Sequence, residues 1–165
     1  MQAITDTKHL TVQTLPPILV LTGEDVGQFE WLKKDILNKI GYDPSDLNYS
    51  YFDMKEASYD EVELDLVSLP FFADEKIVIL DHLLDVTTAK KRNLTDEDLK
   101  QFENYLENPS ESTRLVIFAE GKLDSKRRLV KLLKRDAQII EATTPKEQEV
   151  KRYFASQAQE LGLQF

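Results

Sequence analysis

The chain has 165 residues, of which 41% are hydrophobic, and its formal net charge is −9 at neutral pH. This length and apolar content suffice for one ordinary domain and a fragment of another, while no apolar run approaches the roughly 20 residues of a membrane span. The absence of cysteine excludes disulfides and thiolate metal sites and favours a cytoplasmic location, and the negative charge opposes general binding to nucleic-acid phosphates.

Strand-like apolar runs alternate with helical patterns along the chain. The predicted strands are 18–21, 49–52, 77–80, 115–118 and 137–140. The predicted helices are 24–40, 58–69, 95–108, a basic segment within 121–135, and a last helix from about residue 145. Because continuous apolar strands with helices between them are typical of parallel sheets, the sequence predicts an α/β fold: a five-stranded parallel sheet with helices on both faces.

The turn after the first predicted strand is where a nucleotide-binding protein would carry its phosphate loop. Such a loop needs several glycines and a Lys-Ser/Thr pair to hold the phosphates and magnesium. Here the turn contains Gly23, Glu24 and Asp25, and the first lysine after the strand is Lys33. Since the two carboxylates would repel a triphosphate, the sequence predicts a nucleotide-type scaffold that binds no nucleotide cofactor.

The helix predicted over 58–69 leads into an unusual aromatic stretch. A Ser-x-x-Glu capping box at 58–61 starts the pattern, which continues to Leu69 until Pro70 ends the helix. Phe71 and Phe72 then fall on a short connection to the third strand, where recognition residues concentrate. At least one ring is therefore expected to face outward. The alternative is that both rings cap the edge of the sheet.

The third predicted strand leads into Asp81 and His82. An aspartate here resembles the metal-binding aspartate of a Walker B strand, but His82 stands where the catalytic acid is usual. The only histidines are His9 and His82, neither has a carboxylate at metal-ligand spacing, and no serine lies in a Gly-x-Ser-x-Gly motif. The sequence therefore predicts neither a metal site nor a catalytic site.

Seven basic residues gather in segment 121–135, whose leucines recur at helical spacing. The pattern predicts an amphipathic helix with a basic outer face. Such a face is either an ordinary solvated surface or a contact with nucleic-acid phosphates or with an acidic partner. The residues that would make the phosphate contact are Lys126, Arg127 and Arg128.

Three separated motifs resemble the delta subunit of the bacterial DNA polymerase III clamp loader, and most closely its Firmicute, streptococcal-like members. The motifs are 65–79 (DLVSLPFFADEKIVI), 105–118 (YLENPSESTRLVIF) and 122–131 (KLDSKRRLVK). The resemblance begins near residue 18, extends to the C-terminus and keeps the order and spacing of the family. It implies an AAA+-like domain without a phosphate loop at 16–142, between an N-terminal extension at 1–15 and the beginning of a helical lid domain at 143–165.

The resemblance also implies a role in DNA replication. Members of the family are non-catalytic subunits of the polymerase holoenzyme that bind the beta sliding clamp and open the ring for loading onto primed DNA. The implied partners are the clamp, the delta prime and tau/gamma subunits of the loader, and primed DNA through the assembled complex. No membrane partner is implied.

In that family, the loop after the second helix carries a hydrophobic plug that enters a pocket on the clamp. Matched by motif, the plug is Leu69, Phe71 and Phe72, with Pro70 shaping the turn; Phe71 stands where leucine is more usual. Two other classes stay open from the residues alone. One is a diverged nucleotide-dependent enzyme that uses Asp81, and the other is a nucleic-acid-binding domain that uses the basic segment.

Overall fold

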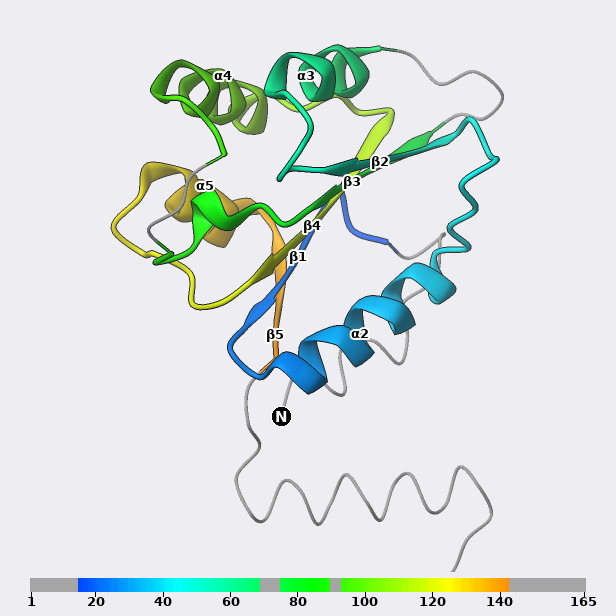
Figure 1. Cartoon of the computed structure of the whole chain (residues 1–165). Coiled ribbons are helices and arrows are strands. Elements are labelled where there is room, and N and C mark those ends of the chain that lie inside the picture. Colours follow the sequence, from blue (N-terminus) through cyan, green and yellow to red (C-terminus); the bar gives the residue numbers. More distant parts are fainter. Residues whose placement is uncertain (1–14, 69–74, 90–92, 143–165) are drawn as a thin grey trace, which may run out of the picture.

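The computed structural model describes residues 15–68, 75–89 and 93–142 (Figure 1). These residues contain a five-stranded sheet with strand order β2-β3-β4-β1-β5, and every neighbouring pair is parallel. The strands are β1 (Ile18–Gly23), β2 (Tyr49–Asp53), β3 (Lys76–Asp81), β4 (Thr113–Glu120) and β5 (Gln138–Glu141). The predicted α/β class, strand number and parallel pairing are confirmed.

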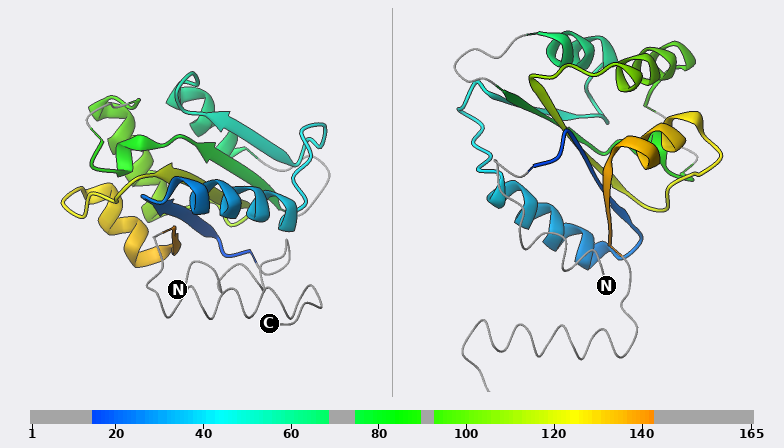
Figure 2. Two further views of the ribbon diagram at one scale, coloured as in Figure 1. Left: turned by 60° about the horizontal axis from the view of Figure 1, so that its bottom comes forward. Right: turned by 180° about the vertical axis from the view of Figure 1, so that it is seen from behind.

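Helices cover both faces of the sheet, as predicted (Figures 1 and 2). Helix α2 (Val26–Lys39) packs on one face. The other face carries α3 (Tyr59–Val67), α4 (Asp96–Glu107) and α5 (Arg128–Asp136), and a short 3-10 helix, η1 (Leu84–Val86), follows β3. Because successive strand residues point to opposite faces, Leu19 and Leu21 join the core under α2, whereas Val20 joins the core under the other three helices.

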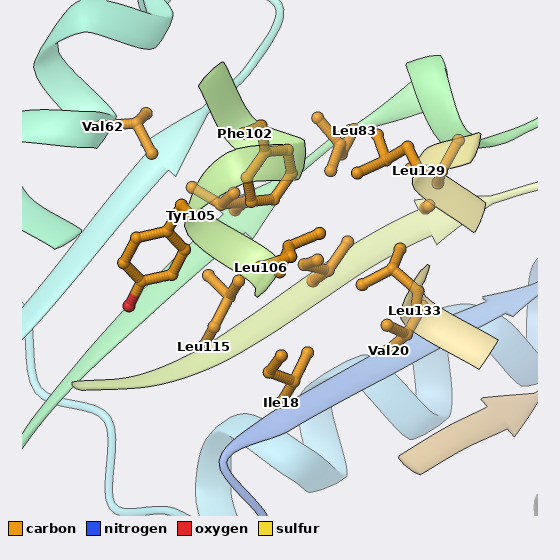
Figure 3. Close-up of a cluster of buried hydrophobic side chains, with 14 of the residues drawn as sticks. Ile18, Val20, Val62, Leu83, Phe102, Tyr105, Leu106, Leu115, Leu129 and Leu133 are labelled. Atoms are coloured by element: carbon orange, nitrogen blue, oxygen red, sulfur yellow. The ribbon is translucent and has the colours of Figure 1, made fainter. Parts of the chain in front are cut away.

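The larger core lies between the sheet and helices α3, α4 and α5. Figure 3 shows Phe102 and Leu106 of α4 and Leu129 and Leu133 of α5 directed toward strand residues such as Leu115. All five side chains are at most 2% exposed. Fully burying one such side chain stabilises a fold by about 1.5–3 kcal/mol. The packing of these helices on the sheet therefore gives the loops at both ends of the strands a stable support.

Helix α3 starts where predicted but differs from the prediction in its cap and in its end. Helix α3 begins after Ser58, but the Ser58 side chain makes no capping hydrogen bond, so the predicted capping box is not formed. The same helix ends at Val67, because Ser68 is already extended with ψ 155°. A capping box does form at the start of α4, where Thr95 and Asp98 exchange hydrogen bonds of 3.1 Å.

The basic helix also starts later than the segment that predicted it. Asp124 accepts a hydrogen bond from the Lys126 N–H at its side chain and from the Arg127 N–H at its carbonyl, both at 3.1 Å. Aspartate favours such local turns over helix, so α5 begins only at Arg128. Lys126 and Arg127 therefore lie on the turn before the helix.

Some predicted segments lie outside the described residues. These are the N-terminal extension apart from Leu15, which is 1% exposed and packs under α2, and the beginning of the lid domain at 143–165, including its predicted helix. Within the part of the chain that the structure describes, no helix has the length and apolar character needed to cross a membrane.

Candidate functional site

The described parts of the predicted sites lie at opposite ends of the parallel strands. Asp81 is the last residue of β3 and lies at the C-terminal ends of the parallel strands. Lys76, the first residue of β3 after α3, lies at their N-terminal ends (Figure 1). Leu69, Pro70, Phe71 and Phe72, on the connection between α3 and β3, lie outside the described residues. The described part of this site is therefore its two stems, the end of α3 and the start of β3.

Lys76, the first residue of β3, joins the two stems. Its side chain is only 5% exposed. The ammonium group donates to the main-chain carbonyl of Asp65, donates to the Ser68 hydroxyl at 2.6 Å, and lies 3.4 Å from the Asp65 carboxylate. A cation at the C-terminal end of a helix is favoured by the helix dipole, and these partners compensate for its burial. The end of α3 is thus fixed to the start of β3.

Strand β4 holds both stems from the other side. The Thr113 hydroxyl donates to the Leu66 carbonyl at 3.1 Å. Arg114 pairs with Glu75 through two nitrogens, one of them 3.2 Å from a carboxylate oxygen. This pairing, led by the side-chain hydrogen bond, holds the pKa of Glu75 below its ordinary value. Bidentate arginine–carboxylate pairs fix orientation, so the described residues on both sides of segment 69–74 are held in place.

At the other edge of the sheet, Asp81 is neutralised from within the chain. Its side chain is 2% exposed, and the Lys33 ammonium lies 2.5 Å from one carboxylate oxygen. The Tyr51 hydroxyl donates to the same oxygen, and the His82 N–H donates to the other at 2.8 Å. Burial and this hydrogen bond raise the pKa of Tyr51. Lys33 thus supplies the positive charge that a metal ion supplies to a Walker B aspartate.

His82 has a carboxylate neighbour that sequence spacing did not reveal. Its Nδ1 lies 3.0 Å from an Asp53 carboxylate oxygen, because Asp53 and Asp81 are paired at the ends of β2 and β3. The His82 backbone is left-handed, with φ 58°, and its carbonyl accepts a hydrogen bond from the Asn93 side chain at 3.1 Å. Even so, among the described residues no group of three or more His, Cys, Asp or Glu side chains could hold a metal ion.

Three backbone N–H groups around the turn after β1 already have partners within the chain. The Gly23 N–H donates to the Gly121 carbonyl at 2.9 Å, and the Asp25 N–H donates to the Ala142 carbonyl at 3.2 Å. The Gln28 N–H donates to the Asp25 side chain, which caps α2. A Cβ atom on Gly23, whose φ is +127°, would lie 2.0 Å from the Ala142 carbonyl oxygen. In a nucleotide site, backbone N–H groups of this turn would donate to the phosphates instead. The three N–H groups named here are therefore not free for that role.

The basic segment is partly paired with acids. Arg127 lies 3.3 Å from the Asp124 carboxylate, and Arg128 pairs with Glu107 on α4. Lys126 is exposed on the preceding turn. A phosphate would therefore compete with existing ion pairs at two of the three predicted positions.

With this geometry in place, comparison with known proteins identifies the family. The family described as "DNA polymerase III, delta subunit" matches residues 19–143. The chain belongs to this family. The resemblance carried by the three sequence motifs is thereby confirmed at the level of the family.

A curated relative agrees with this assignment. DNA polymerase III subunit delta of Bacillus subtilis (strain 168) is 27% identical over 141 residues, which cover 82% of this chain and 40% of the relative. The chain therefore spans less than half the length of this relative.

Solved structures agree on the fold. The Bacillus subtilis DNA clamp loader delta protein matches 96% of this chain with a TM-score of 0.75 and 24% identity, over 47% of that protein. A DNA polymerase III gamma subunit-related protein of Thermotoga maritima matches 89% of this chain with a TM-score of 0.53 and 15% identity, also over 47% of its length. Both likenesses support the described fold, a parallel sheet covered by helices on both faces.

Proposed function

We propose that the chain binds the beta sliding clamp through Leu69, Phe71 and Phe72, with Pro70 shaping the turn, and so helps to open the ring for loading onto primed DNA. The observation that carries the proposal is that both stems beside this segment are fixed, one by Lys76 bound to Ser68 and the other by the Arg114–Glu75 pair. Fixed stems lower the entropy that is lost when two aromatic side chains are ordered in a pocket.

Ring opening follows from differential affinity. A subunit shifts a ring between closed and open shapes only by binding one shape more tightly than the other. Buried aromatic anchors each contribute about 2 kcal/mol or more to an interface, which is enough to bias such an equilibrium. In the assembled loader, the delta prime and tau/gamma subunits would control when this surface reaches the clamp. A clamp loader works on chromosomal DNA, so we expect it in the cytoplasm.

The direct test is binding of this chain to the sliding clamp of its own organism. Surface plasmon resonance with the clamp immobilised should show saturable, specific binding at micromolar concentration or below. A clamp whose hydrophobic pocket is blocked by a saturating pocket-binding peptide is the control and should not bind the chain. Absence of binding to the free clamp would contradict the proposal.

The nucleotide-dependent enzyme is the weaker alternative. We propose that the chain has no catalytic site of its own, because Asp81 is paired with Lys33 and three N–H groups around the turn after β1 have partners within the chain. Calorimetry with magnesium and ATP should show no binding at micromolar concentration. Saturable binding in that range, with matching thermal stabilisation, would instead favour the enzyme.

A phosphate contact through Lys126, Arg127 and Arg128 is a second proposal for the same chain, favoured by the exposed position of Lys126. Each lost phosphate contact lowers the slope of log affinity against log salt by about 0.9 on duplex DNA. Exchanging the three residues for glutamine should lower that slope for the assembled loader on primed DNA and leave clamp binding unchanged. An unchanged slope would show that the face is only solvated.

A further inference from the structure

Strand β2 is the outermost strand on one side of the sheet, with β3 as its one neighbouring strand among the described residues (Figure 1). Such a strand presents a row of main-chain N–H and C=O groups to any strand that approaches it, and natural proteins commonly protect it with lysine, proline or a bulge. The sequence of β2, Tyr-Ser-Tyr-Phe-Asp, contains neither lysine nor proline. Its residues pair one for one with those of β3, so it has no bulge. The outer side of β2 therefore lacks the usual protection against a further strand.

The two ends of β2 show which of its main-chain groups bond to β3. The Ile77 N–H donates to the Asn48 carbonyl, and the Met54 N–H donates to the Asp81 carbonyl, both at 2.9 Å. Because alternate residues of a parallel strand bond to the same neighbour, the residues between these ends that face β3 are Ser50 and Phe52. The main-chain groups that point to the outer side belong to the other three residues, Tyr49, Tyr51 and Asp53.

Only some of these outward groups are used within the chain. The Tyr49 N–H donates to the Asp46 carbonyl at 3.1 Å, and the Asp53 carbonyl accepts N–H groups of the following turn at 3.0 and 2.8 Å. Within the described part of the chain, four outward groups have no such partner: the Tyr49 carbonyl, the Tyr51 N–H, the Tyr51 carbonyl and the Asp53 N–H. The outer side of β2 thus offers two donors and two acceptors.

This set of groups is complementary to itself. If two β2 strands run antiparallel with Tyr51 opposite Tyr51, each Tyr51 N–H can donate to the Tyr51 carbonyl of the other copy. Tyr49 of one copy then lies opposite Asp53 of the other, so each Asp53 N–H can donate to a Tyr49 carbonyl. The groups that this register leaves unused, the Tyr49 N–H and the Asp53 carbonyl, are the two that already have partners within the chain. Shifting the register by one bonded pair in either direction would lose half of the bonds.

We propose that two copies of this chain associate through antiparallel pairing of their β2 strands, centred on Tyr51. This inference does not depend on the proposed function. The Tyr51 side chain is 37% exposed, and the pairing places the two Tyr51 rings opposite one another, where aromatic pairs stabilise a sheet. Each Asp53 lies opposite a tyrosine, so the register places no two carboxylates directly opposite one another.

Sedimentation equilibrium on the wild-type chain tests for the dimer. A contact between two five-residue strands is small, so association should be weak, with monomer at about 10 μM and a growing dimer fraction toward about 1 mM. Because each copy carries a net charge of −9, added salt should strengthen the association by screening the repulsion between copies. A monomer at every concentration up to about 1 mM, at low and at high salt, would overturn the proposal.

Amide hydrogen exchange identifies the surface without any substitution. Exchange at the Tyr51 and Asp53 N–H groups should slow as the protein concentration rises, whereas the Ser50 and Phe52 N–H groups should be protected equally at all concentrations. A dimer with unchanged exchange at Tyr51 and Asp53 would assign the contact to another surface. Full protection of both groups in the monomer would show that residues of the same chain cover β2. Either result would refute the proposal.

A pair of variants at position 51 separates main-chain pairing from side-chain contacts. Tyr51→Pro removes an outward N–H and leaves the bonds to β3, a position at which outer strands tolerate proline, so dimerisation should weaken at least about tenfold. Tyr51→Phe is the matched control, because it loses the same hydroxyl bond to Asp81 but keeps the N–H. The control should dimerise like wild type. Wild-type dimerisation in Tyr51→Pro, or an equal loss in Tyr51→Phe, would overturn the inference, and the exchange measurement decides if Tyr51→Pro does not fold.

Discussion

The ammonium group of Lys33 lies 2.5 Å from the Asp81 carboxylate, at the edge of the sheet where a nucleotide-binding protein would place its metal ion. The lysine comes from α2 and the aspartate ends β3, so the pair joins a helix to the sheet it covers. Lys33 also lies 5.7 Å from the centre of the Phe118 ring, within the range of a cation–π contact. An internal cation therefore neutralises the buried Asp81 carboxylate and links α2 to the sheet.

Replacing Lys33 with methionine should destabilise the domain by about 3 kcal/mol. The change leaves the Asp81 carboxylate buried without its charge partner, and breaking one side of a buried pair typically costs 3–5 kcal/mol. The hydrogen bonds from Tyr51 and His82 remain, which favours the lower end of that range. Urea unfolding measures the change. Lys34→Met, at an exposed neighbouring position, is the control, and an equal effect in both variants would contradict the assignment.

Replacing Lys76 with methionine should weaken clamp binding and lower stability. The change removes the ammonium group that holds the Asp65 carbonyl and the Ser68 hydroxyl, and each lost hydrogen bond typically costs about 0.5–1.5 kcal/mol. Clamp affinity and urea unfolding should be measured on the same preparation. Lys100→Met, on the exposed side of α4, should change neither quantity. If the Lys76→Met variant binds the clamp as tightly as wild type, the stem does not position the binding segment.

Tyr51 should make the stability of the domain sensitive to alkaline pH. Burial and the bond to Asp81 raise the pKa of Tyr51 above its ordinary value of 10.0. Because the folded state keeps the proton that the unfolded chain releases, this contribution is complete below about pH 10 and is lost as pH rises above it. The stability advantage of wild type over Tyr51→Phe should therefore shrink between pH 8 and pH 10.5. Urea unfolding at the two pH values measures this difference in stability. An equal difference between wild type and Tyr51→Phe at both pH values would contradict the raised pKa of Tyr51.

The architecture could be predicted because its signals are local. The apolar runs at 18–21 and 77–80 became β1 and β3, and the helical pattern ending before Pro109 became α4. The end of α3 was missed because it depends on Lys76, which is distant in sequence and reaches back to Asp65 and Ser68.

The contacts at the far edge of the sheet were missed for a similar reason. Asp53 and Asp81 become neighbours only once β2 and β3 pair in register, and the His82–Asp53 contact depends on that pairing. One signal was available: Lys33 comes four residues after Phe29, on the side of the helix that faces the sheet. A lysine at that position indicated a buried acidic partner.

The most direct test of the account is the Phe71→Ala/Phe72→Ala variant, with clamp affinity and melting temperature measured together. If the two rings anchor the interface, affinity should fall by at least about 30-fold, the equivalent of about 2 kcal/mol, while the melting temperature stays close to that of wild type. If both rings instead cap the edge of the sheet, the variant should lose about 3–5 kcal/mol of stability per phenylalanine. Wild-type clamp affinity in this variant, at whatever melting temperature, would contradict the central claim.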